Sequence, residues 1–175
     1  MNGTAIVDKA QVVIARAQQL GVRVVTAESC TAGALATLLS DIPGAGEVLE
    51  GGFICYAKSF KNEVLAVDEK TLEQETAVSR KVALALTQGA LDLSRRADIA
   101  LAVTGVCGPK EDEDGNPIGK AWIALRDRIG GEAYVELQLP GDSTGQLRGE
   151  MMRAALDVLE EHLRAFESVT RTAGA

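Results

Sequence analysis

An uninterrupted apolar run at residues 99–104 constrains the fold more than any other stretch of this sequence. It reads I-A-L-A-V-T, contains no charged residue and is followed by Gly105. A strand with one face in water alternates apolar and polar residues, whereas a continuous run indicates a strand that is buried on both faces. Such a strand belongs in the interior of a layered fold.

Helical and extended patterns alternate around this run. Helices are predicted at residues 4–20, 34–40, 58–67, 79–93 and 147–166, and strands at 22–27, 53–56, 99–104, 120–126 and 132–139. Ser79 is the predicted N-cap of the fourth helix. The last two strands flank Gly130 and Gly131, which predicts a hairpin. The alternation predicts an α/β fold, and the hairpin makes its sheet mixed.

The length of 175 residues predicts a single domain at residues 1–166 and a disordered tail at 167–175. Hydrophobic residues make up 46% of the chain, which is enough for a sizeable core. The net charge of −7 argues against a nucleic-acid-binding surface. No apolar run reaches the length of a membrane span, and the N-terminus lacks a secretory signal pattern.

The three cysteines form no C-x-x-C pair, which favours reduced thiols and a cytoplasmic location over a disulfide framework. Cys30 and Cys107 are expected to be small packing residues rather than nucleophiles. The chain has one histidine, His162, which argues against a His-rich metal site. We therefore expect neither a metal nor a cofactor.

A predicted strand runs directly into a predicted helix at residues 24–33, which read V-V-T-A-E-S-C-T-A-G. The connecting turn holds Glu28, Ser29, Cys30 and Thr31. A hydroxyl at the start of a helix faces unpaired backbone N–H groups and the positive end of the helix dipole, and both stabilise negative charge. Ser and Thr also cap helices for purely structural reasons, so this stretch alone leaves capping and catalysis open.

A serine nucleophile needs a base, and His162 is expected at the surface of the last helix. The base is then a lysine, a carboxylate or a tyrosinate. Tyr56 and Lys61 follow the second predicted strand, and a lysine in apolar surroundings has a lowered pKa that allows it to accept a proton. Taken alone, however, Lys58 and Lys61 are better explained as solvated charges on an exposed helix.

The loop after the buried strand, at residues 105–119, is the longest irregular stretch. Its glycines, Gly105 and Gly108 among them, can present backbone N–H groups to a phosphate or an oxyanion, and Thr104 can add a hydroxyl. The acidic run at 111–114 is better explained as a solvated loop than as a cation site.

Open α/β sheets bind ligands at the carboxyl ends of their strands. The loops that follow three of the predicted strands, at residues 28–33, 56–61 and 105–119, carry the unusual residues described above. We therefore predict that these loops form one site.

Several motifs occur in order along the chain. They are T-A-E-S-C-T-A-G at 26–33, G-G-F-I-C-Y at 51–56, T-A-V-S at 76–79, A-V-T-G-V-C-G-P at 102–109 and L-P-G-D at 139–142. On these motifs, with Lys61 after the second, the chain resembles the CinA C-terminal-domain family over about residues 6–166. These proteins are nicotinamide-nucleotide amidases, also called competence/damage-inducible proteins. The first motif is highly specific, and the others are strong together.

The resemblance implies a three-layer α/β/α sandwich with a mixed, mostly parallel sheet. It implies metal-independent hydrolysis of nicotinamide mononucleotide to nicotinate mononucleotide and ammonia, without a cofactor, in pyridine-nucleotide salvage. Longer members carry an N-terminal pyrophosphatase domain, so the chain resembles a stand-alone form. The expected partner is a small-molecule nucleotide substrate, with no nucleic acid and no membrane, and we expect a homo-oligomer.

Carried over to this sequence, the resemblance makes Ser29 the nucleophile, Lys61 the base and Tyr56 the partner of the base. The substrate-binding residues are expected in the three loops and on the last helix. They are Glu28, Cys30, Thr31, Thr104, Gly105, Gly108 and Arg148.

Some positions depart from the usual pattern of the family. Ala32 stands where glycine is usual, and its methyl group hinders a positive φ. Lys110 and the acidic run replace a glycine-rich segment, and Ser143 replaces an arginine suited to phosphate. Arg148 or Lys110 can substitute for that arginine. These departures leave two alternatives: a non-catalytic paralogue that binds a nucleotide or a partner protein, and an amidase with a different carboxamide substrate.

Overall fold

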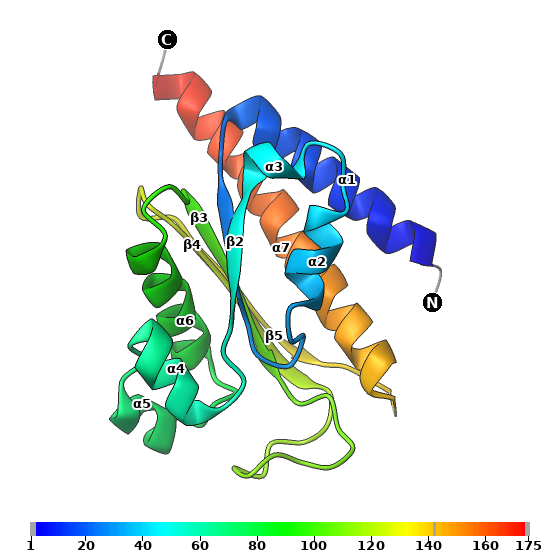
Figure 1. Ribbon diagram of the computed structural model, residues 1–175, viewed down its shortest axis with the longest axis vertical. Coiled ribbons are helices and arrows are strands. Elements are labelled where there is room, and N and C mark those ends of the chain that lie inside the picture. Colours follow the sequence, from blue (N-terminus) through cyan, green and yellow to red (C-terminus); the bar gives the residue numbers. More distant parts are fainter. Residues whose placement is uncertain (1–2, 142, 174–175) are drawn as a thin grey trace.

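The computed structural model describes residues 3–141 and 143–173, which form one sheet between two layers of helices (Figure 1). The strands are β1 (Val24–Glu28), β2 (Leu49–Ile54), β3 (Ile99–Gly105), β4 (Lys120–Asp127) and β5 (Glu132–Gln138). Their spatial order is β2-β1-β3-β4-β5. β1 pairs in parallel with β2 and β3, whereas β4 is antiparallel to β3 and β5. Of these strands β4 alone runs against the others, which confirms a mixed sheet.

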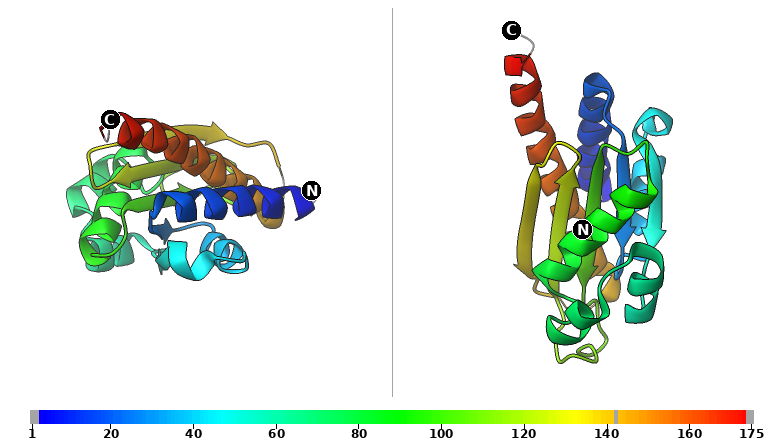
Figure 2. Two further views of the ribbon diagram at one scale, coloured as in Figure 1. Left: turned by 90° about the horizontal axis from the view of Figure 1, so that it is seen from above. Right: turned by 90° about the vertical axis from the view of Figure 1, so that its left-hand side faces the viewer.

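The helices cover both faces of the sheet, as the views in Figure 2 show. They are α1 (Gly3–Leu20), α2 (Ala34–Ser40), α3 (Ala45–Val48), α4 (Lys58–Leu65), α5 (Glu69–Gln74), α6 (Arg80–Leu93) and α7 (Thr144–Ala173). Helices α1, α2, α3 and α7 pack on one face, and α4, α5 and α6 pack on the other. The predicted three-layer α/β/α architecture is therefore confirmed.

Strand β3 lies at the centre of the sheet and is buried on both faces, as its composition predicts. Ile99, Leu101 and Val103 join the core beneath α1 and α7, while Ala100 and Ala102 join the core beneath α6. The small alanines let α6 approach the sheet closely, and the larger aliphatic residues fill the opposite layer. Both faces of β3 are thus covered mainly by aliphatic residues, with Phe166 and Phe53 partly buried against the two cores.

Two boundaries differ from the sequence prediction around β2. The strand covers Leu49–Ile54, not residues 53–56, and the short helix α3 precedes it without having been predicted. The pairing partner of Val24 is Leu49 and that of Val25 is Gly51, so Glu50 is the extra residue of a bulge. Parallel pairing with β1 has therefore overridden the low strand propensity of Glu-Gly-Gly.

Helix α7 extends further than expected. The sequence prediction ends this helix at residue 166 and assigns 167–175 to a disordered tail, but the helix continues to Ala173. Residues 167–173 contain neither glycine nor proline, and Arg16 of α1 donates to the Glu167 carboxylate at 2.9 Å. Residues 174 and 175 lie outside the described part of the chain.

The direction of the strands determines where the loops after them lie. Because β1, β2 and β3 are parallel, the loops after them emerge at the same edge of the sheet.

None of the helices in the described part of the chain is both long enough and apolar enough to span a bilayer.

Candidate active site

A cleft of about 570 Å³ opens where the loops after β1, β2 and β3 meet. Its walls include Ser29 and Cys30 after β1, Tyr56 and Lys61 after β2, and the 105–114 segment after β3. A second cleft of about 580 Å³ lies between β5 and α7, but no Ser, Cys or Lys side chain lines it. The second cleft holds carboxylates and the imidazole of His162, whereas the first brings a serine hydroxyl, thiols and lysines together. All three predicted loops line the first cleft.

Ser29, the first residue after β1, is held in place by the neighbouring strand β3. Its backbone N–H donates to the carbonyl of Val103 in β3 at 2.9 Å, and the residue is 7% exposed. Helix α2 begins only at Ala34, after an N-cap at Gly33 that makes no side-chain capping bond. Neither Ser29 nor Thr31 is therefore the N-cap of α2, which leaves the Ser29 hydroxyl free for another role.

Glu28 supplies the missing cap from the end of β1. Its buried carboxylate accepts from the backbone N–H groups of Gly33 at 2.9 Å, Leu35 at 3.1 Å and Ala36 at 2.8 Å, and from the Thr26 hydroxyl at 3.1 Å. A carboxylate on these otherwise unpaired N–H groups also interacts favourably with the helix dipole. Glu28, expected among the substrate-binding residues, instead fixes the turn that presents Ser29.

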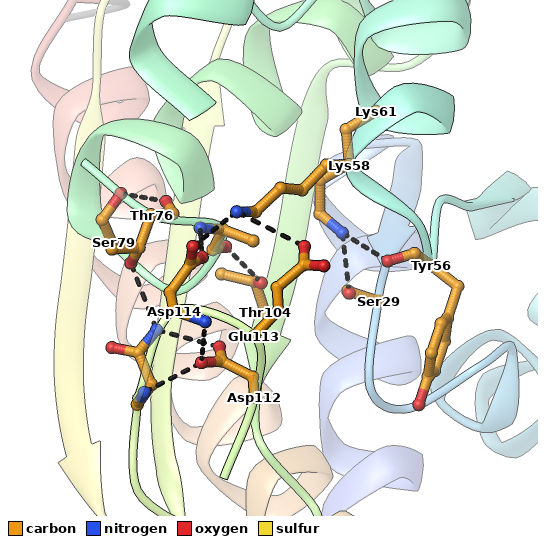
Figure 3. Close-up of polar contacts among 12 residues, drawn as sticks. Ser29, Tyr56, Lys58, Lys61, Thr76, Ser79, Thr104, Asp112, Glu113 and Asp114 are labelled. Atoms are coloured by element: carbon orange, nitrogen blue, oxygen red, sulfur yellow. Dashed lines mark hydrogen bonds and ion pairs between the residues drawn. The ribbon is translucent and has the colours of Figure 1, made fainter. Parts of the chain in front are cut away.

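Lys61 reaches Ser29 from the first turns of α4 (Figure 3). Its Nζ lies 2.9 Å from Ser29 Oγ, 2.8 Å from the Cys55 carbonyl oxygen and 2.9 Å from the Tyr56 carbonyl oxygen. The side chain is 1% exposed, and this burial lowers the pKa of Lys61 from 10.5 to about 8. The alternative that Lys61 is a solvated surface charge is therefore wrong.

The three contacts of Nζ determine what the neutral amine can do. A neutral lysine has two N–H bonds and one lone pair, whereas the ammonium has three donors. The carbonyls of Cys55 and Tyr56 can only accept, so they take the two N–H bonds of the neutral form. The lone pair then faces Ser29 Oγ, whose O–H becomes the donor. The backbone at residues 55 and 56 thus directs the lone pair of a neutral Lys61 toward the Ser29 hydroxyl.

Tyr56 contributes its main chain, and its phenol lies elsewhere. The side chain is 68% exposed, and Figure 3 shows the ring pointing away from Lys61. The structure therefore brings Ser29 and Lys61 together but does not bring the phenol of Tyr56 to them. The phenol lies apart because the chain after β2 turns the carbonyls of Cys55 and Tyr56 toward Lys61, which leaves the side chain of Tyr56 facing solvent.

The loop after β3 forms the wall opposite α4. Thr104 is buried and its hydroxyl donates to the Ala77 carbonyl at 2.8 Å, so this hydroxyl is already engaged. Gly105 packs so closely on β4 that a Cβ would lie 2.7 Å from Cβ of Ala121. Gly108 has φ +84°, a left-handed conformation that glycine adopts without strain. Gly105 and Gly108 both line the cleft, as predicted.

Arg148 and Thr31 lie behind the cleft rather than on its surface. Arg148 Nε donates to the carbonyl of Cys30 at 3.0 Å, which ties α7 to the turn after Ser29. Thr31 is 1% exposed, and its hydroxyl has no partner among the described residues.

Cys30 lines the cleft, but a hydrogen bond with Cys107 and burial raise the pKa of its thiol well above the usual value. This favours a packing role for Cys30 over a nucleophilic one.

The acidic run closes the far end of the cleft. Asp114 pairs with Lys58 Nζ at 2.5 Å and accepts from the backbone N–H of Ala77 at 3.2 Å, while Glu113 lies 3.3 Å from the same lysine (Figure 3). Asp112 accepts from backbone N–H groups within its own loop. In the described residues, no group of His, Cys, Asp and Glu side chains is arranged to hold a metal ion. The acidic run therefore serves to fasten the loop to α4.

Ala32 adopts the conformation that its methyl group disfavours. Its φ is +52°, in the left-handed region. This conformation costs a non-glycine residue about 1–2 kcal/mol. Ala32 therefore carries a conformational cost that a glycine at this position would not.

Sequence reasoning missed two contributors to the site. The carbonyl of Cys55 binds Lys61, and Asp114 joins α4 to the turn before α6. A carbonyl contact leaves no trace in residue type, so no pattern could have found the first. The acidic run was visible in the sequence, but its pairing with Lys58 depends on the folded loop.

Relatives of known sequence match most of this chain. A model of the CinA C-terminal domain matches residues 7–163. A CinA-like protein of Akkermansia muciniphila is 38% identical over 159 residues, which cover 90% of this chain and 37% of the relative. The nicotinamide-nucleotide amidohydrolase PncC of Enterobacter agglomerans is 34% identical over 143 residues, which cover 82% of this chain and 84% of PncC. The chain thus spans little more than a third of the first relative and most of the second.

Solved structures show the same architecture. The competence/damage inducible protein CihA from Agrobacterium tumefaciens superimposes with a TM-score of 0.85 at 37% identity, covering 91% of this chain and 95% of that one. A CinA superfamily protein from Klebsiella pneumoniae superimposes with a TM-score of 0.87 at 31% identity, covering 91% of this chain and 98% of that one. The sequence match, the identities above 30% and the shared fold lead to one conclusion: the chain belongs to the CinA C-terminal domain family.

Proposed function

We propose that this chain is a metal-independent amidohydrolase that converts nicotinamide mononucleotide to nicotinate mononucleotide and ammonia. The observation that carries the proposal is the 2.9 Å contact between Lys61 Nζ and Ser29 Oγ inside the cleft. The name of the Enterobacter relative, a nicotinamide-nucleotide amidohydrolase, supports the choice of substrate. A serine becomes a competent nucleophile only when an adjacent base removes its proton, and a desolvated lysine is such a base.

The reaction begins with Lys61 in its neutral form. Lys61 takes the Ser29 proton as Oγ attacks the carboxamide carbon, which gives a tetrahedral intermediate. The lysine ammonium then returns this proton to the departing nitrogen, so that ammonia leaves and an acyl ester remains on Ser29. A water molecule, deprotonated by Lys61, attacks the ester and releases the carboxylate and the serine. One group thus acts alternately as base and acid.

The negative charge of the tetrahedral intermediate needs donors close to Ser29. The backbone N–H groups of Cys30 and Thr31 follow the nucleophile directly, and neither has an acceptor among the described residues. The N–H of the residue after a nucleophile is a common oxyanion donor. In this proposal these N–H groups receive the developing oxyanion, and Glu28 keeps their turn rigid.

The test is ammonia release from nicotinamide mononucleotide by the purified chain, before and after treatment with EDTA. The parent protein is expected to be active and resistant to the chelator. Ser29→Ala should abolish release, whereas Ser40→Ala, a serine on the exposed side of α2, should not change it. Equal activity of Ser29→Ala and the parent would refute the serine mechanism, and complete inhibition by EDTA would refute metal independence.

One observation favours a second candidate, a paralogue that binds a nucleotide without hydrolysing it, or an amidase for an unphosphorylated carboxamide. The carboxylates of residues 111–114 line the cleft, and Arg148 does not. A phosphate would therefore meet these carboxylates, with Lys58 already paired to Asp114, while Lys110 lines the cleft beside them. Thermal stabilisation by the mononucleotide without ammonia release would support the binding protein, and ammonia release only from unphosphorylated carboxamides would support the shifted substrate. A cytoplasmic location, homo-oligomeric assembly and a role in salvage stay predictions.

A further inference from the structure

Three sulfur atoms from separate elements converge behind the nucleophile. They belong to Cys30 after β1, Cys107 after β3 and Met151 on α7. The thiol of Cys30 lies 3.4 Å from the Met151 sulfur, and the thiol of Cys107 lies 3.6 Å from it. No step of the proposed hydrolysis uses any of these sulfurs.

These three residues, here called the sulfur cluster, lie directly beside the cleft. Cys30 and Cys107 both line the cleft, while Met151 is fully buried behind them. The third cysteine, Cys55, lies in the core on the opposite face of the sheet. The cluster therefore has two buried thiols at the wall of the cleft and one thioether behind them.

We infer that Cys30, Cys107 and Met151 form a binding site for a soft monovalent cation of the Cu(I) type. Thiolate and thioether ligands select Cu(I) over the harder divalent metals. Sulfur donors at about 2.3 Å from a shared trigonal metal are about 4 Å apart. Each thiol needs to move away from the Met151 sulfur by only about half an ångström to reach that spacing.

Charge and ligand count also favour this metal class. Binding replaces two S–H bonds with two metal–sulfur bonds and releases two protons, and the metal keeps its oxidation state. The resulting complex carries one negative charge. Arg148, whose Nε is 3.0 Å from the Cys30 carbonyl, supplies a cation close by. A structural zinc site needs four ligands, and no further His, Cys, Asp or Glu of the described residues completes the set.

The test is an anaerobic titration of the reduced full chain with Cu(I), in competition with a chromogenic Cu(I) chelator. The parent is expected to retain one equivalent, with a thiolate-to-copper absorption in the ultraviolet. Cys107→Ala should weaken binding by more than about a hundredfold, beyond the loss that outer-shell partners cause. Met151→Leu, which conserves volume, should weaken binding by about tenfold while the fold is kept. Cys55→Ala is the matched control and should bind as the parent does.

Three results would overturn the inference. Cys107→Ala could retain copper as tightly as the parent, or Cys55→Ala could abolish retention. The reduced protein could also bind no Cu(I) and instead lose two mass units on exposure to a peroxide, through a disulfide between Cys30 and Cys107. That last outcome would make the two thiols a redox pair and leave Met151 as packing. Circular dichroism of each variant shows that its fold is intact.

Discussion

Replacing Lys61 with methionine should change the stability of the protein in a way that depends on pH. Lys61 is 1% exposed, and its ammonium lies at the wall of the cleft in contact with Ser29 Oγ and two carbonyl oxygens. Methionine matches its length without a charge. The substitution removes the proposed base, so activity is lost, and it also removes the cost of burying a cation.

The size of this effect can be worked out from the contacts of Lys61. The pKa falls from 10.5 to about 8, which at ~1.4 kcal/mol per pH unit makes the buried cation cost about 3 kcal/mol. Methionine leaves the carbonyls of Cys55 and Tyr56 without a donor, at about 1 kcal/mol each. At pH 7 the variant is therefore expected to be more stable than the parent by about 1 kcal/mol.

The sign reverses at higher pH. Between pH 8 and 10.5 the unfolded parent binds more protons at Lys61 than the folded parent does, so the free energy of unfolding of the parent rises with pH. From pH 7 to 9.5 this rise amounts to about 2 kcal/mol. At pH 9.5 the methionine variant is then expected to be less stable than the parent by about 1 kcal/mol.

Urea denaturation of both proteins at pH 7 and pH 9.5 measures this crossover. Subtracting the free energy of unfolding of the parent from that of the variant removes the contribution of all other titrating groups, because these groups are the same in both proteins. Lys70→Met, at an exposed position on α5, is the control and should show no dependence of this difference on pH. A free-energy difference between Lys61→Met and the parent that is the same at both pH values would refute the reasoning, because it would mean that the buried lysine has an ordinary pKa.

Further predictions follow from the contacts around the turn and the base. The kcat/KM of the parent should rise with pH through about 8 and level off above it, because only neutral Lys61 accepts the serine proton; a rate independent of pH from 6 to 9.5 would contradict this role. Tyr56→Phe should keep kcat/KM, because the carbonyl of residue 56 remains, whereas a loss of about a hundredfold would show that the phenol transfers a proton. Glu28→Gln should lower the free energy of unfolding by about 2 kcal/mol, seen in the urea midpoint, because a charged cap on three N–H groups is lost. Ala32→Gly should raise the free energy of unfolding by up to about 1 kcal/mol, measured by the same urea midpoint. Glycine relieves the strain of the left-handed conformation, but its greater conformational entropy in the unfolded chain offsets part of that gain.

Much of the site could be predicted because it depends on the direction of the strands. The composition of β3 indicates a doubly buried strand, and parallel neighbours place the loops after β1, β2 and β3 at one edge. Ser29 and Lys61 were identified as nucleophile and base on residue chemistry and family resemblance, and the structure brings their side chains to 2.9 Å. Their catalytic roles stay predictions.

The parts that could not be predicted depend on where individual groups point. At residue 56 the chain turns its carbonyl toward Lys61 and its phenol to solvent. At residue 28 a carboxylate, a group that could bind a ligand, turns back onto the N–H groups at the start of α2. Residue type alone gives no information about either choice. The boundaries of β2 were missed for a related reason, because its pairing partner, and not its own composition, makes it a strand.

The use of two main-chain oxygens to position Lys61 leaves one neighbouring side chain independent of that contact. Any residue at position 56 brings the same carbonyl, so the exposed side chain there can vary without disturbing Lys61, whereas Cys55 is also held by the core. Tyr56 already faces the cleft mouth, and the 111–114 segment is attached through its own contacts to Lys58 and Ala77. Under the proposed function, mutation at the rim can change what the cleft contacts while the Ser29–Lys61 contact is retained.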